Sequence, residues 1–87
     1  MLNSYKFTED AAADYDFFLR NDPRLAKKVS ELVQDILKHP TQGLGKPEQL
    51  RYKYAGYWSR RVSIEHRLVY KIENDTLIVI SCRYHYK

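Results

Sequence analysis

Hydrophobic positions in the first half of the chain recur at helical spacing. Apolar side chains lie three or four positions apart over residues 11–19 and again over residues 25–36, which is typical of helices that bury one face. Thr8 is a candidate cap for the first helix, and Asp22-Pro23 can start the second because Pro fits the first helical turn. His39-Pro40 should end the second helix, since proline disfavours helical backbone angles in the residue before it. The pattern predicts a helical hairpin.

The second half of the chain alternates apolar and polar positions, which predicts β-strands. A loop is expected over residues 41–48, where two of the three glycines lie close to Pro47. Residues 73–75, Glu-Asn-Asp, are a candidate turn. The candidate strands are residues 3–7, residues 50–54, the segment that starts at Trp58, residues 68–72 and residues 76–84.

Counted without the short candidate at residues 50–54, these elements predict the order β-α-α-β-β-β in a single domain, residues 1–87. A chain of this length has room for one layer of helices on one sheet. We therefore expect an α+β fold in which the two N-terminal helices pack on one face of a mainly antiparallel, twisted sheet. Because neighbouring residues of a strand face opposite sides, Val62 and Ile64 should point toward the helices.

Charge is divided unevenly between the two halves of the chain. Residues 1–44 carry a net charge of −1, and residues 45–87 carry a net charge of +5. A basic half favours a polyanionic partner, most often nucleic acid. A soluble basic domain without such a partner fits the charge equally well.

The single cysteine and the lack of a long apolar stretch narrow the classes of protein that fit this sequence. Cys82 is the only cysteine, so it cannot form an internal disulfide or a thiolate zinc site, and its apolar neighbours indicate a core residue. No stretch approaches the roughly 20 apolar residues of a membrane span, and the N-terminus lacks the apolar segment of a signal peptide. We expect a cytoplasmic protein without a cofactor.

Candidate chemistry is concentrated in the basic half. A carboxylate and a histidine can transfer protons, and arginines can hold the charge that develops on a phosphate, so this half can cleave a phosphodiester without a metal. Strand parity places Arg61 and Arg67 on the polar face of the sheet, with Glu48 at its rim. Arg83 and His85 share a face of the last strand, where Arg83 is a candidate substrate contact. The whole set is Glu48, Arg61, Glu65, His66, Arg67, Arg83, Tyr84, His85 and Tyr86.

Four blocks of sequence in this half form a specific combination. They are Gly45-Lys46-Pro47-Glu48, Gly56-Tyr57-Trp58-Ser59-Arg60-Arg61, Glu65-His66-Arg67-Leu68-Val69-Tyr70 and Cys82-Arg83-Tyr84-His85-Tyr86. With them the chain resembles the YoeB (Txe) branch of the RelE toxin superfamily, over nearly its whole length and most strongly from Gly43 onward. The resemblance implies a RelE-like toxin of a type II toxin–antitoxin pair. It also implies an endoribonuclease that cuts mRNA in the ribosomal A site, without a metal, through attack of the ribose 2′-OH.

The resemblance further implies a role for each residue of the site. Glu48 matches the family's general base, His85 its general acid, and Arg67 the arginine that stabilises the phosphate in the transition state. Without the resemblance, Glu48 would be interpreted as a solvated loop residue and Arg67 as the ion-pair partner of Glu65. His66 is expected to be structural.

Other positions match supporting parts of the family's site. Arg61 and Glu65 match residues of the same pocket, and Arg51 matches a basic residue three positions after the glutamate. Tyr86 matches the near-terminal tyrosine, which could stack on a base. Lys87 extends past that usual last tyrosine and departs from the family pattern.

Partners are implied by the resemblance as well. They are a small acidic antitoxin of the YefM/Axe kind, the ribosome with its mRNA, and a second copy in a homodimer. Two other classes of function stay open: a ParE-like toxin that inhibits DNA gyrase, since the fold alone does not fix the function, and a non-catalytic RNA-binding module. Glu48, Arg67 and His85 together favour the nuclease, because a gyrase inhibitor does not need an acid–base pair.

Overall fold

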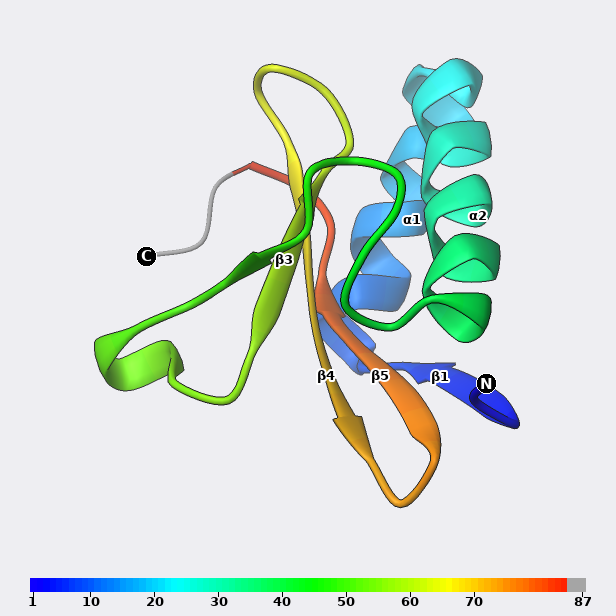
Figure 1. Cartoon of the computed structure of the whole chain (residues 1–87). Coiled ribbons are helices and arrows are strands. Elements are labelled where there is room, and N and C mark those ends of the chain that lie inside the picture. Colours follow the sequence, from blue (N-terminus) through cyan, green and yellow to red (C-terminus); the bar gives the residue numbers. More distant parts are fainter. Residues whose placement is uncertain (85–87) are drawn as a thin grey trace.

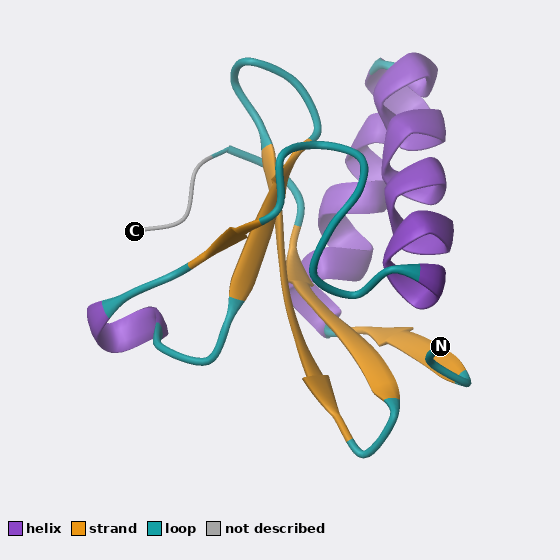
Figure 2. Ribbon diagram, in the orientation of Figure 1, coloured by secondary structure: helices purple, strands orange, loops and turns teal. Residues whose placement is uncertain are grey.

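Two helices cover one face of a five-stranded sheet in the computed structural model, which describes residues 1–84 (Figure 1). The helices are α1 (Glu9–Asn21) and α2 (Pro23–Lys38), joined by a single residue. The remaining elements are β1 (Ser4–Phe7), β2 (Glu48–Gln49), the short 3-10 helix η1 (Tyr52–Tyr54), β3 (Trp58–Arg61), β4 (Arg67–Glu73) and β5 (Thr76–Ser81). Figure 2 shows the two layers, with the helices on one side and the strands on the other.

The strand order in the sheet is β1-β5-β4-β3-β2. β1 runs parallel to β5, and the other three pairs of neighbours are antiparallel. The α+β fold with two helices on a mainly antiparallel sheet is therefore confirmed. The sheet has one strand more than the predicted order, because the two-residue β2 adds an edge next to β3.

Both predicted helix starts are found in the structure. Thr8 Oγ1 accepts a hydrogen bond from the Ala11 N–H at 3.2 Å and donates one to the Ile80 carbonyl at 3.0 Å. This cap satisfies one free N–H of the first turn and also ties the helix to the strand beneath it. Pro23 is the first residue of α2, as predicted. Asp22 occupies the cap position, but within the described residues its side chain bonds to Arg24 instead of capping the helix.

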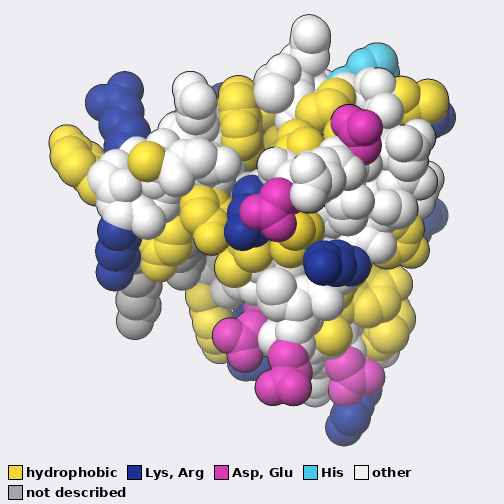
Figure 3. Space-filling view, turned by 90° about the horizontal axis from the view of Figure 1, so that it is seen from below, with side chains coloured by type: hydrophobic (Ala, Val, Ile, Leu, Met, Phe, Trp, Pro, Cys, Tyr) yellow, Lys and Arg dark blue, Asp and Glu magenta, His cyan; other side chains and the backbone are white. Residues whose placement is uncertain are grey.

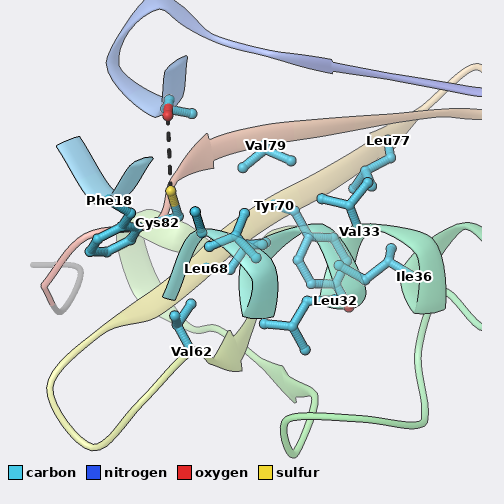
Figure 4. Close-up of a cluster of buried hydrophobic side chains, with 13 residues drawn as sticks. Phe18, Leu32, Val33, Ile36, Val62, Leu68, Tyr70, Leu77, Val79 and Cys82 are labelled. Atoms are coloured by element: carbon cyan, nitrogen blue, oxygen red, sulfur yellow. Dashed lines mark hydrogen bonds between the residues drawn. The ribbon is translucent and has the colours of Figure 1, made fainter. Parts of the chain in front are cut away.

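The core lies between the helices and the sheet (Figure 4). Cys82 is fully buried, as predicted, and its thiol lies 3.9 Å from the Ala11 carbonyl. Burial, with a smaller effect of the Asp14 carboxylate, raises the pKa of Cys82 to about 12. The core side chains include Phe18, Leu32, Val33, Ile36, Val62, Leu68, Tyr70, Leu77 and Val79.

The predicted strand that starts at Trp58 is shorter than the alternation indicated. β3 ends at Arg61, and the next five residues form a turn. Ser63 explains the break, because its Oγ accepts hydrogen bonds from the N–H groups of Glu65 and His66 and so competes with strand pairing. Val62 is buried as expected, whereas Ile64 is 98% exposed at the turn. The prediction that Ile64 points toward the helices was wrong.

Two other strand boundaries differ from the prediction. Residues 50–54 do not form a strand, because Tyr52 adopts a left-handed backbone angle (φ 59°) that extended pairing does not permit. The last strand ends at Ser81 rather than at Tyr84, whose φ of 61° is also left-handed. Within residues 1–84, neither helix is long and apolar enough to cross a membrane.

Candidate active site

The register of three neighbouring strands brings Glu48 close to Arg67. Glu48 on β2 lies opposite Ser59 on β3, and Arg67 begins β4 beside that strand. Arg67 Nη1 donates a hydrogen bond to Ser59 Oγ at 3.1 Å and lies 3.7 Å from Glu48 Oε1. Two residues that the sequence assigned to one site are thus neighbours in the fold. The alternative pairing of Arg67 with Glu65 is not found among the ion pairs of residues 1–84.

Arg67 and Glu48 differ in how firmly the fold holds them. The Arg67 side chain is 16% exposed and has a hydrogen-bond partner in the fully buried Ser59. The Glu48 side chain is 58% exposed. An ion pair this open contributes little to stability. The arrangement is a fixed cation beside a carboxylate that can still reach another group.

Arg61 supplies a second guanidinium on the adjacent strand. It is exposed, and its Cα pairs with that of Arg67 across β3 and β4. Together with Ser63 and Ile64, these two arginines line a shallow depression. Planar guanidinium groups match the oxygens of a phosphate, so this depression can bind an anionic backbone next to Glu48.

Arg51 lies on the other side of Glu48. It is exposed and, with Leu50 and Tyr52, lines a second hollow that Glu48 also borders. Glu48 is thus paired with Arg67 and shares a hollow with Arg51, while Arg61 lies beside Arg67 on the adjacent strand. In the view of Figure 3, basic and acidic side chains are interspersed over the visible face, so the basic half does not form one continuous positive surface there.

A buried arginine, which the sequence reasoning missed as a functional residue, holds the loop before Glu48. The Arg60 side chain is fully buried, and its five N–H groups all donate to acceptors around the loop between α2 and β2. This loop crosses from the end of α2 to the edge of the sheet (Figure 2). The acceptors are Asp35 Oδ2 at 2.6 Å, Gln42 O at 2.9 Å, Leu44 O at 3.1 Å, Tyr70 Oη at 3.2 Å and the carbonyl of His39.

Burial and the Arg60 guanidinium act in opposite directions on the pKa values of two partners of Arg60, Asp35 and Tyr70. Burial alone would raise the pKa of Asp35, but the hydrogen bond from the Leu44 N–H and the bond and charge of Arg60 outweigh it and lower that pKa. Burial raises the pKa of Tyr70, although Arg60 opposes the change. Tyr70 Oη also donates to the Pro40 carbonyl at 2.8 Å. The cluster therefore favours the charged form of Asp35 and holds the loop from His39 to Leu44.

His66 is buried and fastens the C-terminal segment next to the start of β4. Its ring is buried against Phe18, with ring centroids 5.0 Å apart, and its Nδ1 accepts a hydrogen bond from the Tyr84 N–H at 2.7 Å. The Arg67 N–H donates to the Tyr84 carbonyl at 3.0 Å. Glu65 Oε1 lies 3.6 Å from His66 Nε2, so Glu65 accompanies this histidine rather than an arginine.

Arg83 occupies a different environment from the other predicted arginines. Its guanidinium lies over the Phe17 ring of α1, 3.5 Å from the centroid, and its Nη2 donates to Tyr84 Oη at 3.1 Å. These contacts direct it toward the helical layer, and they do not join it to Glu48 or Arg67. His85 and Tyr86 lie outside the described residues, so their predicted places in the site remain predictions. Among residues 1–84, no group of three or more His, Cys, Asp or Glu side chains is arranged to hold a metal ion.

Two positions, Ser59 and Arg60, were missed as part of the site's architecture. Both belong to a sequence block that indicated the site, but the prediction gave neither a role. Arg60 lies two residues before Val62, so strand alternation puts it on the same side, toward the helices. A charged residue on that apolar face was the available signal, because a buried charge needs a partner.

This fold also occurs in a protein of low sequence identity. YafQ from Escherichia coli shares it at a TM-score of 0.75, over 93% of this chain and 91% of that one, with 16% identity. That likeness shows a common fold only. The family model described as "YoeB-like toxin of bacterial type II toxin-antitoxin system" matches residues 7–86. The chain therefore belongs to the family of YoeB-like toxins of type II toxin–antitoxin systems.

Individual relatives agree with this assignment. Toxin YoeB from E. coli K12 is 44% identical over 80 residues, which cover 92% of this chain and 95% of the relative. Toxin YoeB from Synechocystis is 48% identical over 81 residues, 93% of this chain and 94% of the relative. The structure of a YoeB/ParE toxin from Agrobacterium tumefaciens superposes with a TM-score of 0.94 at 42% identity, covering 97% of this chain and all of that one.

Solved structures from Staphylococcus aureus are similar in fold and sequence. A YoeB dimer superposes with a TM-score of 0.90 at 39% identity, covering 99% of this chain and all of that one. A heterotetrameric YoeB-YefM toxin–antitoxin complex superposes with a TM-score of 0.88 at 41% identity, covering 99% of both chains.

Proposed function

We propose that this toxin is a ribosome-dependent endoribonuclease that cuts mRNA in the A site and so stops translation. The proposal rests on the ion pair between Glu48 and Arg67, whose side chains approach within 3.7 Å. The Arg67 guanidinium is mostly buried and donates a hydrogen bond to Ser59. A carboxylate beside a fixed cation is what attack of a 2′-OH on a phosphate requires. Because ribosomes are cytoplasmic, the same proposal places the protein in the cytoplasm.

The reaction follows from these groups. Glu48 removes the proton of the ribose 2′-OH, and the freed oxygen attacks the adjacent phosphorus. Arg67 and Arg61 stabilise the charge that grows on the phosphate oxygens. His85 gives a proton to the 5′-oxygen as the P–O5′ bond breaks. The products are a 2′,3′-cyclic phosphate and a 5′-hydroxyl, and no metal takes part.

The exposure of Glu48 supports a need for the ribosome. A general base that is open to water is poorly oriented and competes with solvent for the proton. Docking of Glu48 and its neighbours Arg51 and Tyr52 against ribosome-bound mRNA would cover the carboxylate and bring it to the 2′-OH. The free toxin should therefore cut naked RNA slowly.

The test is a purified translation reaction in which new mRNA 5′ ends are mapped. The native protein should cut within the A-site codon only when ribosomes are present. Glu48→Gln and His85→Ala should each slow cleavage by about 10²–10⁴-fold, and Arg67→Ala by a similar factor, while ribosome binding stays near native. Intact mRNA with the native protein would overturn the proposal.

The product ends provide a second check on the mechanism. A 2′,3′-cyclic phosphate or 3′-phosphate is expected, whereas a 3′-hydroxyl would exclude attack by the 2′-OH. If the mRNA stays intact, DNA supercoiling by gyrase should be assayed next, because gyrase inhibition is the activity expected of a ParE-like toxin. Salt-sensitive RNA binding without cleavage would indicate an RNA-binding module.

We also propose an antitoxin of the YefM/Axe kind and a homodimer as partners of this chain. The S. aureus complexes, in which a 41% identical YoeB is joined to YefM, support the first, and the S. aureus YoeB dimer supports the second. An acidic, disordered antitoxin segment would pair with Arg51, Arg61 and Arg67 as it folds. Co-purification with a co-expressed YefM-type antitoxin, and light scattering of the free toxin, would test the two partners separately.

A further inference from the structure

The main chain of Tyr84 is held on both sides by two consecutive residues of the site. Its N–H donates to His66 Nδ1 at 2.7 Å, and its carbonyl accepts from the Arg67 N–H at 3.0 Å. The second of these residues is the arginine that lies beside Glu48. The C-terminal segment is therefore fastened directly next to the proposed active site.

The conformation of Tyr84 needs this support. Its φ of 61° lies in the left-handed region, which is sterically unfavourable for a bulky residue. β5 has already ended at Ser81, so the segment no longer has a strand ladder to hold it. The imidazole of His66 also contacts the Tyr84 ring, with centroids 5.3 Å apart. One side chain thus supplies both the acceptor and the packing surface for this turn.

The surroundings of His66 favour Nδ1 as the ring nitrogen that accepts the hydrogen bond from the Tyr84 N–H. Nε2 faces the Glu65 carboxylate at 3.6 Å, which favours a proton on Nε2. Nδ1 then keeps a free lone pair for the Tyr84 N–H, because the two nitrogens of a neutral imidazole cannot both carry the proton. A purely space-filling residue at this position would need neither nitrogen.

We infer that His66 is a positioning residue for the C-terminal segment: its Nδ1 fixes Tyr84 and with it the point from which His85 starts. The inference rests on the proposed function, in which His85 is the proton donor. His85 follows Tyr84 by one peptide bond, so a displacement of the Tyr84 carbonyl moves the starting point of the donor relative to Arg67. A misplacement of about 1 Å can cost about 10²-fold in rate.

Two substitutions separate the acceptor from the packing. His66→Phe keeps an aromatic ring against Phe18 but removes the acceptor. His66→Asn loses the ring but places an amide oxygen near the position of Nδ1. A merely structural role predicts that Phe is the milder change, because it fills the buried site. The positioning role predicts the opposite order in the rate of cleavage.

The experiment measures single-turnover mRNA cleavage on saturating ribosomes, ribosome affinity, urea unfolding and amide exchange at Tyr84. We expect His66→Phe to cleave about 10–100-fold more slowly with ribosome affinity near native. Its Tyr84 amide should exchange roughly tenfold faster, as expected for one lost hydrogen bond. His66→Asn should be the less stable protein in urea yet recover most of the cleavage rate and of the amide protection.

Each contrary result has a distinct meaning. Native cleavage by His66→Phe, with His85→Ala inactive in parallel, would overturn the positioning role and leave the nuclease proposal intact. Equal loss in both His66 variants would reduce the residue to packing and also overturn the inference. Absence of cleavage by the native protein would overturn the proposed function itself, and the role of His66 in cleavage with it.

Discussion

Replacement of Arg60 by lysine should destabilise the protein and loosen the loop that precedes Glu48. The Arg60 guanidinium is fully buried and donates to five acceptors, among them Asp35 at 2.6 Å. Lysine keeps the charge, but its single nitrogen has three donors and no planar fork. It can retain the ion pair with Asp35 while leaving about two of the loop's acceptors without a donor.

The magnitude follows from the acceptors that lose their partners. A buried polar group without a hydrogen bond costs about 1–3 kcal/mol, and water reaching the loop should reduce the total, so we expect a loss of about 3 kcal/mol. The total stability of a domain of this size is about 4–13 kcal/mol, from about 0.05–0.15 kcal/mol per residue. A loss of about 3 kcal/mol should lower Tm by roughly 12–24 °C. Arg60→Met, which leaves the half-buried Asp35 without its cation and removes all five donors, should cost more than Arg60→Lys.

Urea unfolding of the native protein, Arg60→Lys and Arg61→Lys provides the assay. Arg61 is the exposed neighbour and serves as the control for stability, where its change should stay within about 0.5 kcal/mol. The midpoint for Arg60→Lys should fall, and the slope should stay constant because the same surface is exposed on unfolding. An unchanged midpoint for Arg60→Lys would refute the idea that this guanidinium holds the loop.

Four further changes test other parts of the structure. The pKa of Asp35 is lowered in the folded protein, so its contribution to stability is complete above its usual pKa of 3.8 and is lost as the pH falls through the lower folded value. Asp35→Asn should remove that part of the pH dependence of urea unfolding. Gly43→Ala should cost about 1–3 kcal/mol in the same assay, because φ is 114° and the new Cβ would collide with the Asp35 carboxylate. Cys82, buried and with a pKa raised to about 12, should resist thiol reagents until the protein unfolds; rapid labelling of the native protein would contradict this. Ser59→Ala should slow mRNA cleavage about 2–10-fold by removing the acceptor for Arg67, and a native rate would show that this bond does not orient the arginine.

The helical hairpin was predictable because its signals are local. Apolar spacing, a threonine at the first cap and a proline at the second helix start all lie within the segments that they determine. The order of the main elements followed from the same reasoning. The parallel pairing of β1 with β5 was not predicted, since it joins residues more than 70 positions apart and leaves no local trace.

The site was predictable in its residue types but not in its contacts. Glu48 and Arg67 were assigned to one site through their sequence blocks, and the structure brings them within 3.7 Å. Alternation along β3 suggested a longer strand, because it does not reveal that Ser63 closes a turn with its own side chain. Arg83 was expected beside the other arginines, but its guanidinium stacks on Phe17 instead.

The parts that the sequence did not reveal have a common physical character. Arg67 lies at the start of a strand, where the sheet fixes its position, whereas Glu48 begins a two-residue edge strand and His85 follows a segment that has left the sheet. The sheet therefore holds Arg67 within a seven-residue strand, whereas Glu48 is held by only a two-residue edge strand. Two side chains hold the neighbouring segments: Arg60 holds residues 39–44 of the loop that leads to Glu48, and His66 holds Tyr84. Because Arg60 acts through three backbone carbonyls 16–21 residues away, and His66 through one backbone N–H 18 residues away, their roles emerge only once the chain is folded. The geometry of proton transfer should therefore be more sensitive to changes at these two buried residues than to changes at the exposed arginines.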